Sequence, residues 1–315
     1  MIIQGPEAGL SNQENTQNPE YEDTRYYIEH SLPEEFRNLP ELQGNITTKK
    51  LAEFLAKKVR EYIADTFFDQ HLINYLNVFL NEFEFNGKAY DAPTILLHSI
   101  AVAFIARDFC QDKQIGTDEF YPRDRFSPQE AFVACLTHDY GKLDAKIKPI
   151  VNNSHPIWNG NSNLHALSLT PEKWRLIRQH PIVGANKINP LLRKFGVDKR
   201  RSRLILDACL YHQQYWCPSS KDLQSQKSYP NKKMKRNQIP LIDRVCILVD
   251  SYCAGIDPFR KFYQNLSSPE QMIKTIRQQS GPHFDSHLVG QFVEWLEAKL
   301  NITELEKEVM EIETT

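Results

Sequence analysis

Residues 127–144 read SPQEAFVACLTHDYGKLD, and this stretch carries the strongest fold signal in the chain. Its opening SPQE predicts a helix start, because proline suits the first helical position. The apolar run at 132–136 continues as a buried helix would. That run leads directly into His138 and Asp139, two polar residues at the end of an apolar helix.

Most other apolar runs also have helical character. Residues 95–109 are apolar all round, as in a core helix, and Pro93-Thr94 is a plausible start for it. No stretch shows the sustained alternation that half-buried strands require, so the sequence predicts an all-α fold. The further helical runs are at residues 49–63, 71–83, 171–180, 203–211, 240–254 and 287–312.

The chain divides into an acidic start and a helical body. Residues 1–45 are rich in Gln, Asn, Pro and Glu, and we expect them to form a flexible acidic segment that cannot order itself alone. Two stretches without periodicity, 143–170 and the basic 216–238, predict long loops. The remaining parts are N-terminal helices at 46–90, the main domain at 91–300 and a C-terminal helical tail at 301–315.

Composition limits the class of protein. The 315 residues carry a formal net charge of -2, so a uniformly basic nucleic-acid binder is not the default reading. The six cysteines form no C-x-x-C pair, which predicts buried free thiols in a reducing compartment. No signal peptide is visible at the start, and no segment approaches about 20 uninterrupted apolar residues. We therefore expect a cytoplasmic protein without a membrane segment.

Six polar residues interrupt apolar helices near their ends. Any one of these histidines alone is more often a satisfied core or surface residue than a metal ligand. As a set they predict a metal site, because buried imidazoles and carboxylates are costly unless shared divalent cations satisfy them. A central carboxylate could bridge two metals that activate a water for attack on a phosphate ester. The six are His98, His138, Asp139, His180, His212 and Asp250.

These residues resemble the HD-domain phosphohydrolases, and within them the bacterial HD-GYP cyclic-di-GMP phosphodiesterases. The resemblance covers residues 93–296 and rests on LLHSIAVA around His98, HDYGK at 138–142 and HPIVG at 180–184. It implies a helical bundle of the HD-domain type with additional N- and C-terminal helices. It also places Asp250 at the last metal-ligand position.

Other positions depart from that family. Its His-His-Glu triplet is YHQ at 211–213, its Gly-Tyr-Pro signature is SYP at 228–230, and its Arg-Pro-Tyr-Arg stretch is DPFR at 257–260. Thr94 stands where some members have a metal-binding Glu. Because Thr94 and Tyr211 both replace ligands of a third metal, the resemblance favours two metals.

The resemblance also implies roles for residues near the metals. Asp139 would be the bridging, catalytic ligand, and Lys142 would act with Arg260 to hold a phosphoryl oxygen and offset its developing charge. Tyr229, in SYP, would contact the substrate. The two divalent cations could be iron, manganese or nickel, since affinity order alone does not choose among them.

The sequence thus predicts a metal-dependent phosphohydrolase acting on a nucleotide phosphodiester, with cyclic di-GMP as a candidate. One alternative is a catalytically degenerate HD-GYP-like module that binds nucleotide and signals, with acidic residues 1–45 docking a protein partner. Another is an HD-domain protein of DNA mobilisation, suggested by basic clusters at 193–203 and 232–236. Turnover tests the first alternative, and salt-dependent DNA binding tests the second, less favoured one.

Overall fold

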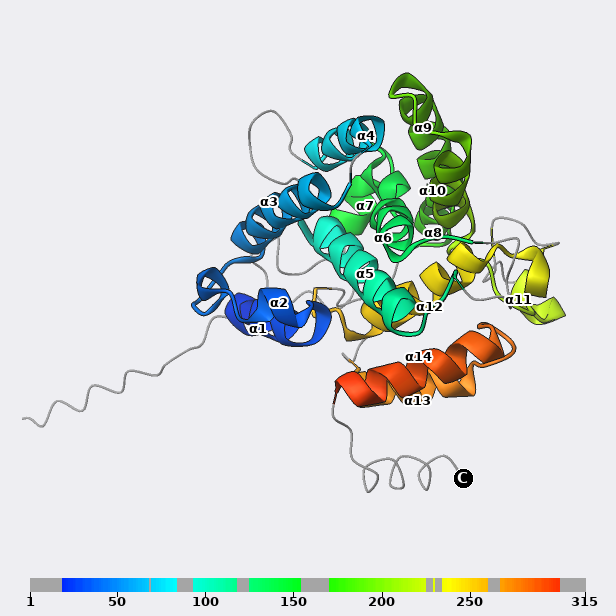
Figure 1. The fold of residues 1–315 in the computed structure, drawn as a ribbon. Helices are drawn as coiled ribbons and strands as arrows, with labels where there is room; N and C mark the ends of the chain where they lie inside the picture. Colours follow the sequence, from blue (N-terminus) through cyan, green and yellow to red (C-terminus); the bar gives the residue numbers. More distant parts are fainter. Residues whose placement is uncertain are drawn as a thin grey trace, which may run out of the picture.

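The computed structural model describes residues 19–67, 69–83, 93–117, 125–153, 170–224, 229, 234–259 and 267–300. Within these ranges the chain forms helices and no β-strand, apart from one isolated bridge between Ser280 and Phe284. The all-α prediction is therefore confirmed (Figure 1). The elements are α1 (Pro19–Ser31), α2 (Glu34–Arg37), η1 (Pro40–Leu42), α3 (Thr48–Thr66), α4 (Gln70–Asn81), α5 (Pro93–Asp112), α6 (Pro128–Thr137), η2 (Tyr140–Leu143), α7 (Lys148–Asn153), α8 (Pro171–Ile177), α9 (His180–Lys194), α10 (Lys199–Tyr211), α11 (Ser220–Gln224), η4 (Arg236–Gln238), α12 (Leu241–Ile256), α13 (Pro269–Gln278) and α14 (Ser286–Lys299).

Helix α5 lies at the centre of the bundle, with α3, α6 and α12 packed around it (Figure 1). Because every face of α5 meets another helix, its side chains are apolar all round, as the sequence predicted. By length and composition α5 could cross a membrane, but 94% of its most apolar stretch is buried inside the protein. The apolar composition of α5 is therefore explained by its burial in the core of the bundle.

Helix α6 begins as its sequence predicts and ends at the HDYGK motif. The Ser127 side chain accepts the Glu130 backbone N–H, the Glu130 side chain accepts the Ser127 N–H, and Pro128 fills the first turn. The helix ends at Thr137, and His138 follows as its C-cap. The change from α6 to the short 3-10 helix η2 turns the backbone directly at the two motif residues.

Two glycines let η2 and α9 pack backbone against backbone. A Cβ added to Gly141 would lie 1.8 Å from the His180 carbonyl oxygen, and one added to Gly184 would lie 2.9 Å from the Gly141 backbone nitrogen. Helix α6 has already ended before Gly141, and glycine is required at this position because the two backbones touch. This contact brings the HDYGK and HPIVG stretches together.

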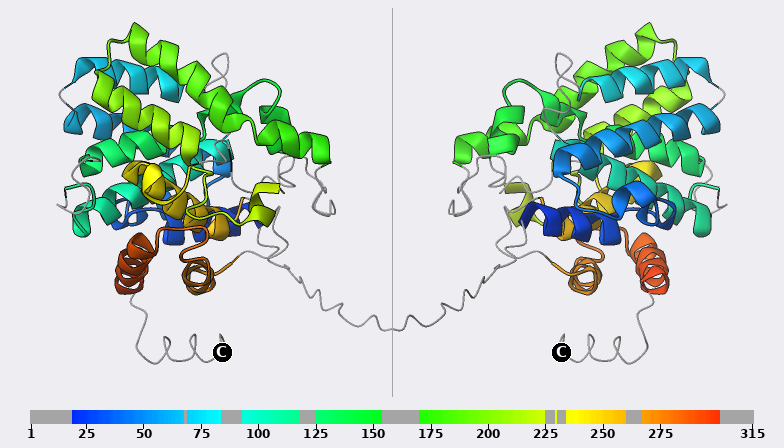
Figure 2. Two further views of the ribbon diagram at one scale, coloured as in Figure 1. Left: turned by 90° about the vertical axis from the view of Figure 1, so that its right-hand side faces the viewer. Right: turned by 90° about the vertical axis from the view of Figure 1, so that its left-hand side faces the viewer.

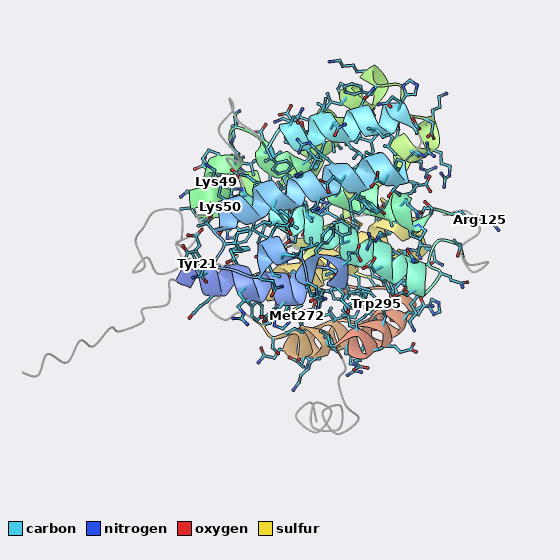
Figure 3. All side chains as sticks on the ribbon, turned by 60° about the vertical axis from the view of Figure 1, so that its left-hand side comes forward. Tyr21, Lys49, Lys50, Arg125, Met272 and Trp295 are labelled. Atoms are coloured by element: carbon cyan, nitrogen blue, oxygen red, sulfur yellow. The ribbon has the colours of Figure 1, made fainter. Side chains whose placement is uncertain are left out.

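Helices α13 and α14 pair with each other and cover α12 (Figure 2). Figure 3 shows Met272 and Trp295 on this pair, where it meets the rest of the bundle. A Cβ at Gly255 of α12 would lie 2.1 Å from Met272 Sδ, so the small residue permits close packing. Trp295 donates its indole N–H to Asp112 at the end of α5. The predicted tail at 301–315 lies outside the described residues.

The prediction of a flexible segment up to residue 45 was wrong for residues 19–45, which form α1, α2 and η1. Tyr27 is 1% exposed and donates its hydroxyl to the Leu97 carbonyl of α5. Arg107 of α5 pairs with Glu35 at 2.9 Å. The segment has too few apolar residues to order itself, but it orders by packing on α5, α3 and α12. Residues 1–18 lie outside the described ranges.

The two predicted loops contain short helices. Residues 143–170 include α7, and 216–238 include α11 and η4, whereas 154–169, 225–228 and 230–233 lie outside the described residues. The prediction of buried free thiols is confirmed, since all six cysteines are unpaired and Cys217 alone is partly exposed.

Candidate metal centre

The structure brings all six predicted metal ligands together in the interior. Each is at most 5% exposed, and they come from five separate elements. Because these elements are distant in sequence, only the packing of the bundle unites them. Their positions are His98 in α5, His138 and Asp139 after α6, His180 at the start of α9, His212 after α10, and Asp250 in α12.

Three of the histidines are oriented in the same way. Each Nδ1 lies within hydrogen-bond distance of the carbonyl three residues earlier, so Nδ1 carries a proton and Nε2 is the nitrogen directed at the centre. Local helix-end geometry therefore sets the tautomer that a metal requires. The acceptors are Cys135 O for His138 at 2.6 Å, Ile177 O for His180 at 2.7 Å and Cys209 O for His212 at 2.9 Å.

Asp139 lies between two groups of donor atoms. Its Oδ2 is 3.8 Å from His98 Nε2 and 3.4 Å from His138 Nε2. Its Oδ1 is 3.2 Å from His180 Nε2 and 3.4 Å from His212 Nε2. The two carboxylate oxygens thus face different pairs of imidazoles, as a bridging ligand between two cations would.

Asp250 completes the first group. Its Oδ1 lies 2.8 Å from His98 Nε2 and 3.7 Å from His138 Nε2. The first group is therefore His98, His138, Asp139 and Asp250, and the second is Asp139, His180 and His212. Within each group the donor atoms lie within 4.8 Å of one another, close enough to surround one ion.

Coordination of divalent cations would satisfy these donor atoms better than hydrogen bonds among themselves do. His138 Nε2 is buried and makes no hydrogen bond of acceptable geometry within the described residues. His180 Nε2 and His212 Nε2 are 2.8 Å apart although both Nδ1 protons are directed at carbonyls. Two lone pairs at that distance repel unless a proton or a metal lies between them. Imidazole with carboxylate is a donor set that suits iron, manganese, nickel or zinc.

Burial and neighbouring charges set the protonation states. Burial alone would raise the pKa of Asp139, but the Lys142 ammonium and His138 hold that pKa well below its usual value. Burial lowers the pKa of His180 to about 4 despite the nearby Asp139 carboxylate. For His138 burial also lowers the pKa, yet Asp139 and Asp250 outweigh it and raise the value to about 10. A cation binding at the first group would therefore displace the His138 proton.

The predicted substrate-contacting residues have different surroundings. Lys142 forms an ion pair with Asp139 Oδ2 and is 12% exposed, so its ammonium lies at the edge of the centre. The Tyr229 ring lies 6.4 Å from the His180 ring, and its backbone N–H donates to Gln213 O at 3.2 Å. Arg260 lies outside the described residues. Contact of all three with substrate stays a prediction.

Sequence reasoning missed two residues that lie beside the ligands. Gln213 donates its amide N–H to Asp250 Oδ2 at 3.1 Å, and Asp257 Oδ2 lies 3.9 Å from His98 Nδ1. Both had been noted only as departures from a family pattern. For Asp257 a positional signal existed, because it follows Asp250 by seven residues, about two helical turns, directly after α12 ends at Ile256. Gln213 directly follows His212, but its partner on α12 is not visible from sequence.

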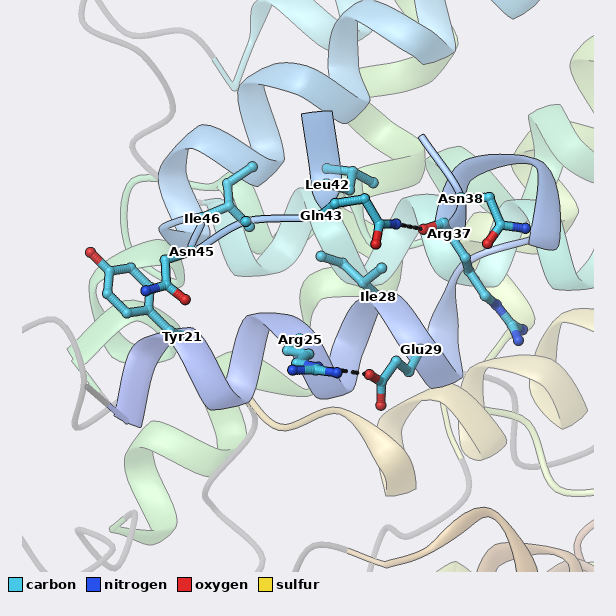
Figure 4. Close-up of a pocket in the computed structure, with 11 residues that line it drawn as sticks. Tyr21, Arg25, Ile28, Glu29, Arg37, Asn38, Leu42, Gln43, Asn45 and Ile46 are labelled. Atoms are coloured by element: carbon cyan, nitrogen blue, oxygen red, sulfur yellow. Dashed lines mark hydrogen bonds and ion pairs between the residues drawn. The ribbon is translucent and has the colours of Figure 1, made fainter. Parts of the chain in front are cut away.

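A separate cavity of about 480 Å³ opens between α1 and residues 37–46 (Figure 4). Tyr21, Arg25 and Arg37 are among its lining residues, and none of the six predicted ligands is. Arg25 is already paired with Glu29 at 2.9 Å. This cavity is therefore independent of the candidate metal centre.

The HD domain family profile matches residues 95–255, which is more than half of the chain and contains all six predicted ligands. The chain belongs to the HD-domain family. It is an HD-domain protein with a buried His and Asp cluster of the kind used by metal-dependent phosphohydrolases. No curated protein matches it.

Two solved structures are similar to this HD-domain protein. One is Bd1817, an HDG"Y"P protein from Bdellovibrio bacteriovorus, with 13% identity, a TM-score of 0.44, and coverage of 79% of this chain and 69% of that chain. The other is the HD domain of L. monocytogenes phosphodiesterase PgpH in complex with cyclic-di-AMP. It has 19% identity, a TM-score of 0.41, and coverage of 67% of this chain and 92% of that chain.

Proposed function

We propose that this HD-domain protein hydrolyses a nucleotide phosphodiester with the help of two divalent cations. The observation that carries the proposal is the position of Asp139, whose two oxygens face two separate groups of buried donors. One cation would be held by His98, His138, Asp139 and Asp250, and the other by Asp139, His180 and His212. Such cations, when bound, supply an activated water and neutralise phosphoryl charge.

The protein's own residues support this chemistry. Asp139 is ionised and buried, so it can hold both cations at a fixed separation without competition from solvent. Lys142 already lies on Asp139 Oδ2 at the edge of the centre, where its charge would offset negative charge developing on a phosphoryl oxygen. The surrounding helices exclude bulk water, which strengthens each of these interactions.

The corner between α8 and α9 supports a nucleotide rather than a small phosphate ester as substrate. Trp174 is 42% exposed, and the Arg178 guanidinium lies 5.9 Å from its ring centroid. Burial raises the pKa of Tyr229, and the charge of Arg178 acts on this hydroxyl in the opposite direction. A base could stack on Trp174 while a phosphate lies near Arg178. The HD-GYP resemblance makes cyclic dinucleotides the first substrates to test.

The structure weakens the DNA-mobilisation alternative. Several cations of the 193–203 cluster are paired within the protein: Arg200 with Glu130, Arg201 with Asp69, and Arg203 with Asp207. Paired arginines contribute less to phosphate binding than unpaired ones. A cytoplasmic location, and a protein partner for the acidic segment, stay predictions.

The test is turnover of reconstituted protein. Protein purified without chelator is assayed for metal content, loaded with Mn²⁺ or Fe²⁺, and offered cyclic dinucleotides, mononucleotides and a bis-phenyl phosphate. We expect two metal ions per chain and cleavage of at least one phosphodiester. Binding of both metals without any turnover would instead favour the degenerate signalling module.

A further inference from the structure

The two oxygens of Asp250 have different partners. Oδ1 faces the centre, 2.8 Å from His98 Nε2 and 3.7 Å from His138 Nε2. Oδ2 instead accepts a hydrogen bond from Gln213 Nε2 at 3.1 Å. Asp250 is therefore held as a terminal ligand with one oxygen available, in contrast to the bridging Asp139.

The chemistry of the pair determines which way the Gln213 amide points. Asp250 Oδ2 is the acceptor of this hydrogen bond, so the Gln213 amide presents its NH₂ group to the carboxylate. A glutamate at position 213, as in the His-His-Glu triplet of the resembled family, would instead bring a second carboxylate against Asp250.

The backbone of Gln213 connects this contact to the second group. Gln213 directly follows His212, and its carbonyl accepts the Tyr229 N–H at 3.2 Å. The Tyr229 ring lies 6.4 Å from the His180 ring. One residue thus contacts a ligand of the first group through its side chain and borders the second group through its backbone.

We propose that Gln213 is a positioning residue that fixes Asp250 with Oδ1 directed at the first cation. The inference rests on the proposed two-cation function and names the residue that distinguishes the terminal carboxylate from the bridging one. Without the amide, the Asp250 carboxylate can rotate about its last bond and present either oxygen. Outer hydrogen bonds of this kind typically change metal affinity about 10- to 100-fold.

The experiment measures Mn²⁺ binding by calorimetry to the full chain after metal removal. We compare the wild type with Gln213→Leu, which keeps the size but removes the donors, and Gln213→Glu, which keeps the shape but adds a charge. Gln70→Leu, an exposed position on α4, is the matched control. We expect Gln213→Leu to weaken one of two Mn²⁺ sites by about 10-fold, Gln213→Glu to weaken it further, and the control to bind as wild type.

A double-mutant cycle with Asp250→Ala separates positioning from a general structural effect. In the Asp250→Ala background, Gln213→Leu should cause no additional loss of Mn²⁺ affinity, because the carboxylate that it positions is gone. Wild-type affinity in Gln213→Leu, tighter binding by Gln213→Glu, or an undiminished effect in the Asp250→Ala background would overturn the proposal.

These results are distinguishable from failure of the proposed function. If the wild type binds two Mn²⁺ ions but cleaves no phosphodiester, the hydrolase proposal fails while the affinity comparison still supports Gln213. If the wild type binds no Mn²⁺, both proposals fail. Thermal melting of each metal-free variant confirms that any loss of binding does not come from unfolding.

Discussion

The two halves of the centre differ in composition and in support. The half formed by α5, the end of α6 and α12 contributes two carboxylates and two imidazoles, and a hydrogen bond of 2.8 Å already joins His98 to Asp250. The half formed by α9 and α10 contributes two imidazoles, His180 and His212, and shares only Asp139 Oδ1. Its two Nε2 atoms face each other at 2.8 Å.

This difference would distinguish the two proposed cations. The half with two carboxylates carries more negative charge and would favour a hard divalent cation such as Mn²⁺, whereas the half with more imidazole would favour a softer one such as Ni²⁺ or Zn²⁺. The first half has hydrogen bonds that hold it together without a metal. The second depends on a proton or cation to relieve the contact between its imidazoles. Substitutions that act on one half or on both can test this comparison.

Asp139→Ala should have the largest effect, because both halves share this carboxylate. We expect loss of both metals and a fall of phosphodiesterase activity to background, measured by metal analysis of purified protein and by turnover. Retention of the fold is checked by circular dichroism. If either metal stayed at full occupancy, Asp139 would not be the bridge.

His212→Ala and Asp250→Asn form a matched pair that separates the halves. The first should remove the cation of the α9 and α10 half, and the second should weaken the other cation, each with an activity loss of about 100-fold or more. Metal stoichiometry falling from two to one in His212→Ala is the expected result. Equal loss of both metals in both variants would mean that the halves are not separate sites.

Lys142→Ala should leave metal content unchanged while lowering the turnover rate. The ammonium lies on Asp139 Oδ2 at the edge of the centre and is proposed to act on phosphoryl charge rather than on metal retention. We expect a loss of about 100-fold in kcat, the scale for removing one charge-stabilising group. Lys142→Arg serves as the control that retains the charge, and a metal-depleted Lys142→Ala protein would contradict the assigned role.

Trp174→Ala should act on substrate binding alone. If a base stacks on this exposed ring, KM for a nucleotide should rise about 5- to 100-fold, the range expected for one stacking contact. The KM for a bis-phenyl phosphate, which has no base to stack, and the metal content should both stay unchanged. Equal changes in KM for the two substrates would exclude a role in recognising the base.

The smallest effect is expected at Glu130, which links α6 to the α10 side of the centre. Burial would raise the pKa of Glu130, but Arg200 and the Ser127 N–H outweigh it and lower the pKa below 4.5. A lowered folded-state pKa stabilises the fold above 4.5, and this contribution disappears as the pH falls through the folded pKa. Glu130→Gln should lower the melting temperature at pH 7. The melting temperature of this variant should also fall less steeply than that of the wild type as the pH decreases. If the melting temperature of the variant fell with pH as steeply as that of the wild type, ionisation of Glu130 would not contribute to stability.

Local patterns predicted the helices because their causes are local. The start of α6 is set by Ser127, Pro128 and Glu130, which act within one turn. The apolar sequence of α5 reflects a helix enclosed on every face. The ordering of residues 19–45 could not be predicted, because Tyr27 and Arg107 contact partners 70 or more positions away in the sequence, and do so only after the bundle forms.

The same distinction holds at the centre. The sequence by itself determined which six residues could be ligands. Burying a polar side chain at the end of an apolar helix costs free energy unless it has a partner, so such positions can be recognised in the sequence. The packing of the bundle determined which oxygen of Asp139 faces which pair of imidazoles, and that Gln213 reaches Asp250. These arrangements depend on crossings between helices that are distant in the chain, and no local pattern of residues encodes such crossings.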